Sequence, residues 1–125
     1  DKVLIVDDAL FMIEIIKDAL SPLFKNVSEA RTKSEALALL DTFKPDCISL
    51  DLSLNSHDAL QGMVFLRELR LKANQVPVVV ISALDQEWIN DEIQQLGPTR
   101  YLRKPFDIKT LHDLVNSLMK EVHNE

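Results

Sequence analysis

Five short apolar runs alternate with five segments whose apolar residues recur at helical spacing, and this alternation strongly constrains the fold. Runs this short are typical of buried strands, whereas apolar positions three or four residues apart indicate amphipathic helices. The predicted strands cover residues 3–6, 26–31, 47–51, 77–82 and 100–103, and the predicted helices begin near residues 9, 32, 62, 85 and 107. Strands that alternate with helices form parallel sheets with right-handed crossovers. We therefore predict an α/β fold, a doubly wound five-stranded parallel sheet with five helices.

Capping and turn residues mark several boundaries of these elements. The candidate N-caps of the second, fourth and fifth helices are Thr32, Asp85 and Asp107. Thr32 and Glu35 together have the form of a capping box. The fourth helix is predicted to run through Leu96, because Gly97–Pro98 supplies a stop signal directly after it. The polar residues of the second strand predict that it lies at or near an edge of the sheet.

The length and composition of the chain indicate a single acidic domain. The 125 residues suffice for a single hydrophobic core, and a formal net charge of −6 argues against a nucleic-acid-binding surface. The single cysteine, Cys47, cannot form an internal disulfide, and no apolar stretch is long enough to span a bilayer, so we expect a cytoplasmic protein without membrane contact. Because the chain starts at Asp1 rather than Met, its origin in a longer polypeptide stays open.

Reactive polar residues stand at the ends of four predicted strands: Asp7 and Asp8, Asp51, Ser82, and Lys104. Because the carboxyl ends of parallel strands share one edge of a sheet, we expect these side chains to gather in one crevice. Three carboxylates repel one another unless a cation lies between them, and a hard divalent ion such as Mg²⁺ prefers oxygen ligands. No pair of cysteines or histidines stands at metal-ligand spacing, so we predict Mg²⁺ rather than zinc.

The same crevice suits a phosphoryl group. An anion bound to the cation would face the ammonium of Lys104 and the hydroxyl of Ser82. The metal and the ammonium neutralise phosphoryl oxygens while a carboxylate oxygen, that of Asp51, attacks in line.

Four segments carry a family resemblance: Leu4–Asp8, Ser49–Asp51, Val80–Ala83 and Tyr101–Phe106. In this order and at these separations they resemble the receiver domain of two-component response regulators, and the resemblance covers essentially the whole chain, residues 1–125. It implies a flavodoxin-like sheet with strand order 2-1-3-4-5.

The resemblance also implies roles for the acidic residues. Asp51 would accept a phosphoryl group from a phosphohistidine on a histidine kinase or a histidine phosphotransfer protein. Mg²⁺ would bind through Asp7, Asp8, Asp51 and the backbone carbonyl of Ser53. The chain would then be a signalling phosphoacceptor, with Mg²⁺-assisted self-phosphorylation and autodephosphorylation, rather than an enzyme that acts on a separate substrate.

Three further residues take implied roles on the other side of the crevice. Ser82 and Lys104 would hold the phosphoryl oxygens, and a cis peptide bond between Lys104 and Pro105 is expected. Ser82 and Tyr101 would form a switch that changes the face made by the fourth helix, fifth strand and fifth helix. We expect that face to bind partners or to form a homodimer.

Two departures from the family pattern and two alternatives accompany this interpretation. Asn55 stands where the family has proline, and Gly62 comes eleven residues after Asp51, which suggests about three inserted residues; Ser82 replaces the more frequent threonine. A haloacid-dehalogenase-like phosphohydrolase would need a second aspartate where this chain has Ser53. A receiver fold used only for protein interaction, without phosphorylation, stays open.

Overall fold

The computed structural model describes residues 1–54, 60–84 and 87–123. Its strands are β1 (Lys2–Val6), β2 (Asn26–Ala30), β3 (Cys47–Leu50), β4 (Val78–Ser82) and β5 (Thr99–Arg103). All neighbouring strands are parallel, and their order is β2-β1-β3-β4-β5. This order confirms the predicted doubly wound sheet, and β2 lies at an edge as its polar sequence predicted.

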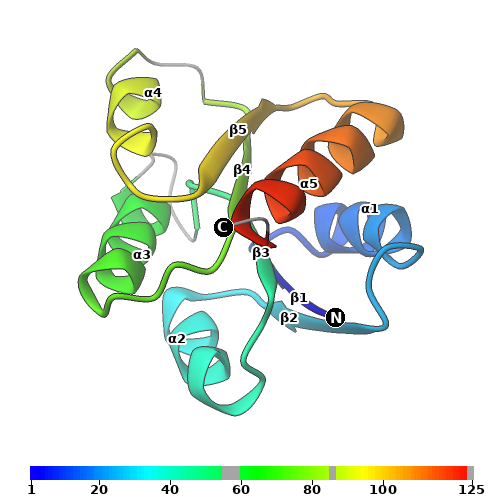
Figure 1. Cartoon of the computed structure of the whole chain (residues 1–125), viewed down its shortest axis with the longest axis horizontal. Helices are drawn as coiled ribbons and strands as arrows, with labels where there is room; N and C mark the ends of the chain where they lie inside the picture. The colour runs from blue at the N-terminus through cyan, green and yellow to red at the C-terminus, as the bar shows by residue number, and fades with distance from the viewer. Residues whose placement is uncertain (55–59, 85–86, 124–125) are drawn as a thin grey trace.

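The helices cover both faces of this sheet (Figure 1). They are α1 (Leu10–Leu20), α2 (Lys33–Thr42), α3 (Leu60–Leu71), α4 (Glu87–Ile93) and α5 (Ile108–His123). Helices α1 and α5 lie together on one face, whereas α2, α3 and α4 line the other. The loop around Asn55 and the predicted cap Asp85 lie outside the described residues.

Each face of the sheet has its own hydrophobic core, because alternate residues of a strand point to opposite sides. In β1, Leu4 and Val6 pack into the cluster under α2, α3 and α4, whereas Val3 and Ile5 pack into the cluster under α1 and α5. All four side chains are at most 1% exposed. A strand buried on both faces is mostly apolar, which is why β1, β3 and β4 were recognisable as apolar runs, although β3 contains Ser49 and β4 ends in Ser82.

Local capping interactions start two of the helices where the sequence predicted. The Thr32 hydroxyl accepts a hydrogen bond from the Glu35 amide (3.1 Å), and the Glu35 carboxylate accepts one from the Arg31 amide (2.9 Å). At α5 the Asp107 carboxylate accepts from the Thr110 amide (2.7 Å). The bonds to Thr32 and Asp107 satisfy amides that the first turn of a helix leaves without partners, and the Arg31 bond holds the residue before the N-cap.

Helix α4 is shorter than predicted, because it ends at Ile93 rather than Leu96. After Ile93 the chain tightens into turns, in which the Gln95 amide donates to Glu92 (3.0 Å) and the Leu96 amide donates to Ile93 (3.1 Å). Gly97 then adopts a left-handed conformation (φ +72°) that directs the chain into β5. The stop signal therefore acts through a short turn placed between the helix and the glycine.

Helix α3 begins at Leu60, two residues before the predicted start, and Gly62 lies in its first turn. The Gly62 amide donates to the Leu52 carbonyl (2.8 Å). A Cβ atom at residue 62 would lie 2.3 Å from the Leu52 Cα, so only glycine permits this close approach. The contact brings the start of α3 against the segment that follows β3.

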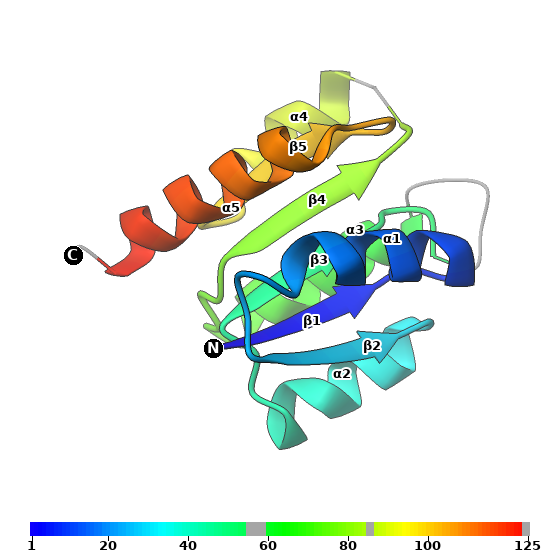
Figure 2. The same cartoon turned by 90° about the vertical axis from the view of Figure 1, so that its right-hand side faces the viewer.

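All five strands point in one direction, so their carboxyl ends share an edge (Figure 2). The start of β1 and the end of α5 lie at the opposite edge. Among the helices in the described part of the chain, none is both long and apolar enough to cross a membrane.

Candidate functional site

The ladder of the sheet continues past the strand ends and fixes the backbone of the crevice. The Asp7 amide donates to the last carbonyl of β2 (3.0 Å), and the Asp51 amide donates to the last carbonyl of β1 (2.9 Å). The Lys104 amide donates to the carbonyl of Ser82, the last residue of β4 (2.9 Å). These bonds bring the predicted residues to one edge of the sheet.

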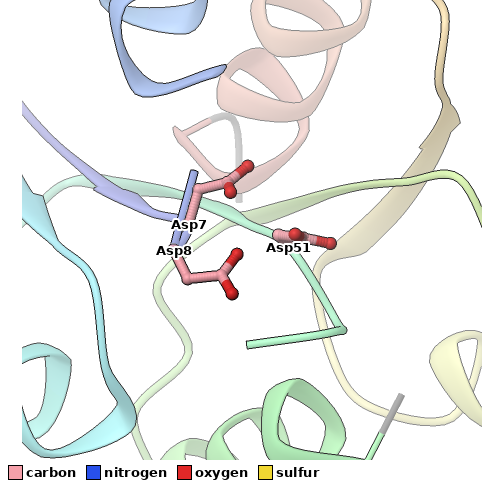
Figure 3. Close-up of side chains that lie close together, drawn as sticks. All are labelled: Asp7, Asp8 and Asp51. Carbon is pink, nitrogen blue, oxygen red and sulfur yellow. The ribbon is translucent and has the colours of Figure 1, made fainter. Parts of the chain in front are cut away.

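Three carboxylates meet at this edge. Oxygens of Asp7, Asp8 and Asp51 all lie within 4.8 Å of one another. Figure 3 shows Asp7 and Asp8 at the end of β1, beside Asp51 at the end of β3. Asp7 is 1% exposed and Asp51 is 6% exposed, while Asp8 is partly exposed. Like charges this close and this dry are unfavourable without a cation.

The Lys104 ammonium supplies positive charge from β5. Its Nζ lies 3.3 Å from Asp7 Oδ2 and 3.6 Å from Asp51 Oδ2. The other oxygen of Asp7 accepts a hydrogen bond from the Ala9 amide (2.9 Å). Burial nevertheless raises the pKa of Asp7, and the nearby Asp51 charge raises it further, against the lowering effects of the Ala9 amide and Lys104. One ammonium therefore does not offset the cost of burying the Asp7 carboxylate.

The carboxylate of Asp51 also receives Ser53. The Ser53 amide lies 3.3 Å from Asp51 Oδ1, and the Ser53 hydroxyl lies 3.3 Å from each of the two carboxylate oxygens. The sequence prediction used only the backbone carbonyl of Ser53, so the role of its hydroxyl was missed. The spacing of two residues after a strand-end aspartate was the available signal, because a short polar side chain there can fold back on the carboxylate.

Ser82 and Tyr101 meet at the segment that follows β4. The Ser82 hydroxyl accepts a hydrogen bond from the Leu84 amide (3.2 Å). The Tyr101 hydroxyl donates to the Leu84 carbonyl and lies 3.3 Å from the Ser82 carbonyl. Both predicted switch residues thus bind the same short segment, one through its amide and the other through its carbonyls.

Arg31, from the β2–α2 connection, is a neighbour that the sequence interpretation did not identify. Its guanidinium donates to the backbone carbonyl of Asp8 (3.1 Å). This contact depends on β2 lying beside β1, which a local sequence pattern does not reveal. The peptide bond between Lys104 and Pro105 is cis, as the family resemblance led us to expect.

The donor set of the crevice fits a hard divalent cation. Its three clustered side chains offer only carboxylate oxygens, which Mg²⁺ and Ca²⁺ prefer. Burial, and then the nearby charge of Asp51, raise the pKa of Asp7, so its ionised form is disfavoured in the protein alone. A bound cation would stabilise that form directly.

The chain is similar to known proteins in both sequence and fold. The sequence model of the response regulator receiver domain matches residues 3–116. The protein-glutamate methylesterase/protein-glutamine glutaminase of Pyrococcus horikoshii is 33% identical over 96% of this chain, which spans 34% of that relative's length. Chemotaxis protein CheY of Listeria monocytogenes is 33% identical, over 84% of this chain and 87% of its own.

A solved structure shows the same arrangement. The receiver domain of Francisella response regulator 1452 superposes with a TM-score of 0.82 at 33% identity, covering 97% of this chain and 98% of its own. The match to the family spans far more than half of the chain. This chain therefore belongs to the response regulator receiver domain family of two-component signalling systems.

Proposed function

We propose that the domain accepts a phosphoryl group on Asp51 from a phosphohistidine of a histidine kinase or histidine phosphotransfer protein. The observation that carries the proposal is the position of the Asp51 carboxylate: it lies 3.6 Å from the Lys104 ammonium and within 4.8 Å of oxygens of Asp7 and Asp8. A nucleophile there is flanked by a cation and by a pair of metal-ligand candidates, which is what phosphoryl transfer requires.

In the proposed reaction an oxygen of Asp51 attacks phosphorus in line. The new O–P bond forms as the P–N bond to the donor imidazole breaks, and the bonding electron pair leaves with the imidazole nitrogen. Lys104 and the Ser82 hydroxyl stabilise negative charge on the phosphoryl oxygens. Asp7, Asp8, Asp51 and the backbone carbonyl of Ser53 would hold Mg²⁺, which supplies charge neutralisation at the same oxygens when bound.

The output of the reaction is a change at the face formed by α4, β5 and α5. A phosphoryl group adds negative charge of about −1.5 to −2 and new acceptor oxygens. Ser82 reaches those oxygens by giving up the Leu84 amide, to which it is now bonded at 3.2 Å. The Tyr101 hydroxyl, which contacts the same segment, then loses its present partners and reorients. The altered face binds a partner or a second copy of the domain.

The test is phosphorylation by a small donor. Incubation with acetyl phosphate and Mg²⁺ should add the mass of one phosphoryl group, detected on the intact protein. Asp51→Asn should abolish this addition, whereas Asp41→Asn, which alters an exposed carboxylate on α2, should retain it. Labelling that persists in Asp51→Asn would show that another residue accepts the phosphoryl group. A wild-type protein that neither acetyl phosphate nor a histidine kinase labels would instead support a phosphorylation-independent interaction domain.

A further inference from the structure

Arg70, near the end of α3, makes five hydrogen bonds with two segments, residues 74–76 and 96–99. Its Nε donates to the Leu96 carbonyl (2.5 Å). Its Nη1 donates to the carbonyls of Asn74 (2.9 Å) and Val76 (2.7 Å), which precede β4. Its Nη2 donates to the Pro98 carbonyl (3.2 Å) and the Thr99 hydroxyl (2.9 Å). A guanidinium has five N–H donors, so this side chain uses its full capacity.

All five acceptors are uncharged, although the guanidinium carries a positive charge. Burial lowers the pKa of Arg70 to about 10, which still leaves it protonated at neutral pH. Burial is therefore unfavourable for the charge itself, and the five oxygens replace hydrogen bonds that water would otherwise supply.

The chain between α4 and β5 is built around this side chain. Gly97 has φ +72°, and a Cβ atom there would lie 3.0 Å from Arg70 Nε and 2.6 Å from Gln75 Oε1. The Thr99 hydroxyl donates in turn to the Leu96 carbonyl (2.8 Å), which closes a small network with the guanidinium. Residues 96–99 are therefore fixed to α3 and to the segment before β4.

The two ends of α4 are held by different partners. Leu84, three residues before α4 begins, is bonded by the switch residues Ser82 and Tyr101. The connection after α4 is bonded by Arg70 instead. Helices α3 and α4 lie side by side, and an Arg67–Glu92 ion pair also links them (Figure 1).

We propose that Arg70 is a positioning residue that fixes the C-terminal end of α4, so that phosphorylation of Asp51 moves the other end of this helix. The fixed end is a property of the resting protein. The movement rests on the proposed function. A helix held at one end converts a local change at Leu84 into a tilt, and the pocket of about 380 Å³ that includes Asn90, Gln94 and Tyr101 changes shape as a result.

Hydrogen exchange of the resting protein tests the fixed end. Arg70→Gln should speed hydrogen exchange of the Gln95, Leu96 and Val76 amides by about tenfold over the wild type. This factor is taken after correction for any change in global unfolding of the variant. Lys72→Gln is the matched control, since it makes the same charge change on an exposed side chain just after α3. Arg70→Lys keeps the charge but not the forked geometry, so it should resemble Arg70→Gln, and it takes the place of Arg70→Gln if that variant does not fold. Equal protection of these amides in the Arg70 and Lys72 variants would overturn the proposal.

The movement is tested by the NMR chemical shifts of backbone amides on addition of Mg²⁺ and beryllofluoride, which mimics a phosphoryl group on Asp51. In the wild type the amide resonances of Ala83 and Leu84 should shift. Those of Gln94, Gln95 and Leu96 should change no more than the resonances of residues far from Asp51. In the folded Arg70 variant both groups should shift. Shifts of Gln94–Leu96 as large as those of Leu84 in the wild type would overturn the fixed end. If no amide resonance near Asp51 shifts, the proposed function fails. Hydrogen exchange in the resting protein still tests whether Arg70 fixes the C-terminal end of α4.

Discussion

Asp7 is a single residue whose burial lowers the stability of the folded protein at neutral pH. Its carboxylate is almost completely buried, and burial raises its pKa above the ordinary value of 3.8. As pH rises from that value through the raised pKa, the unfolded chain has already lost the proton that the folded protein still holds. The free energy of unfolding therefore falls with pH across this window, and the ionised side chain is a cost at neutral pH.

Asp7→Asn should accordingly stabilise the protein in the absence of Mg²⁺. We expect its Tm at neutral pH to rise by about 3 °C, the shift that roughly 1 kcal/mol produces in a domain of this size. The gain should shrink as pH falls toward 4, because the wild-type carboxyl then becomes neutral. Thermal unfolding across a pH series measures this, with Asp41→Asn as the control for loss of one negative charge. A lower Tm for Asp7→Asn would mean that the bonds from Ala9 and Lys104 outweigh burial.

At the scale of elements, the end of α3 contains a residue in an unfavourable conformation. Ala73 has φ +59°, and its amide donates to the Arg70 carbonyl (3.0 Å) while the Asn74 amide donates to Leu69 (3.2 Å). This is the left-handed turn that ends many helices, and glycine is its usual residue. Ala73 is exposed, so its Cβ makes the left-handed conformation costly and gains no core packing that would offset the cost.

Ala73→Gly should therefore raise the free energy of unfolding by about 0.5 kcal/mol, because relief of backbone strain exceeds the added flexibility of the unfolded chain. The matched control is Ala38→Gly, an exposed position inside α2, where the same change should cost about 1 kcal/mol. Urea unfolding midpoints at equal m-values measure both. Similar losses in the two variants would show that the left-handed turn carries no strain.

Elements were more predictable than their ends or their long-range contacts. Every predicted strand and helix exists, because strands buried on two faces are mostly apolar and helices must repeat their apolar residues. The end of α4 was wrong by one turn, since the chain after Ile93 is held by Arg70 from another helix. No pattern local to residues 87–98 encodes a partner that far away in sequence.

In the candidate site, too, the grouping of strand-end residues was predictable from the sequence, whereas a long-range contact was not. Asp7, Asp8 and Asp51 could be grouped from sequence because parallel strands deliver their carboxyl ends to one edge. The contact of Arg31 with Asp8 could not, because it requires the neighbour relationship of β1 and β2 and a particular side-chain direction. The roles of the grouped residues in phosphoryl transfer remain predictions for the labelling experiment.

At the scale of the whole molecule, we expect a metal ion bound in the acidic crevice to raise global stability. A ligand that binds only the folded state stabilises it by about 2.7 kcal/mol at a hundred times its Kd. Mg²⁺ should therefore raise the Tm of the wild type in a concentration-dependent way. Asp8→Ala should lose most of this increase, whereas Asp18→Ala, an exposed carboxylate on α1 with the same charge change, should keep it. Equal responses in both variants would assign the effect to general screening of the net charge of −6.

The position of the two chain ends has a practical consequence. The first residues of β1 and the last turn of α5 lie at the edge of the sheet away from the crevice (Figure 2). A fluorophore, an affinity tag or a surface tether joined at either end would therefore leave the carboxylates and the cation of Lys104 open to a docking protein. The proposed binding to a histidine kinase can then be tested on an immobilised domain, with the crevice facing the solution.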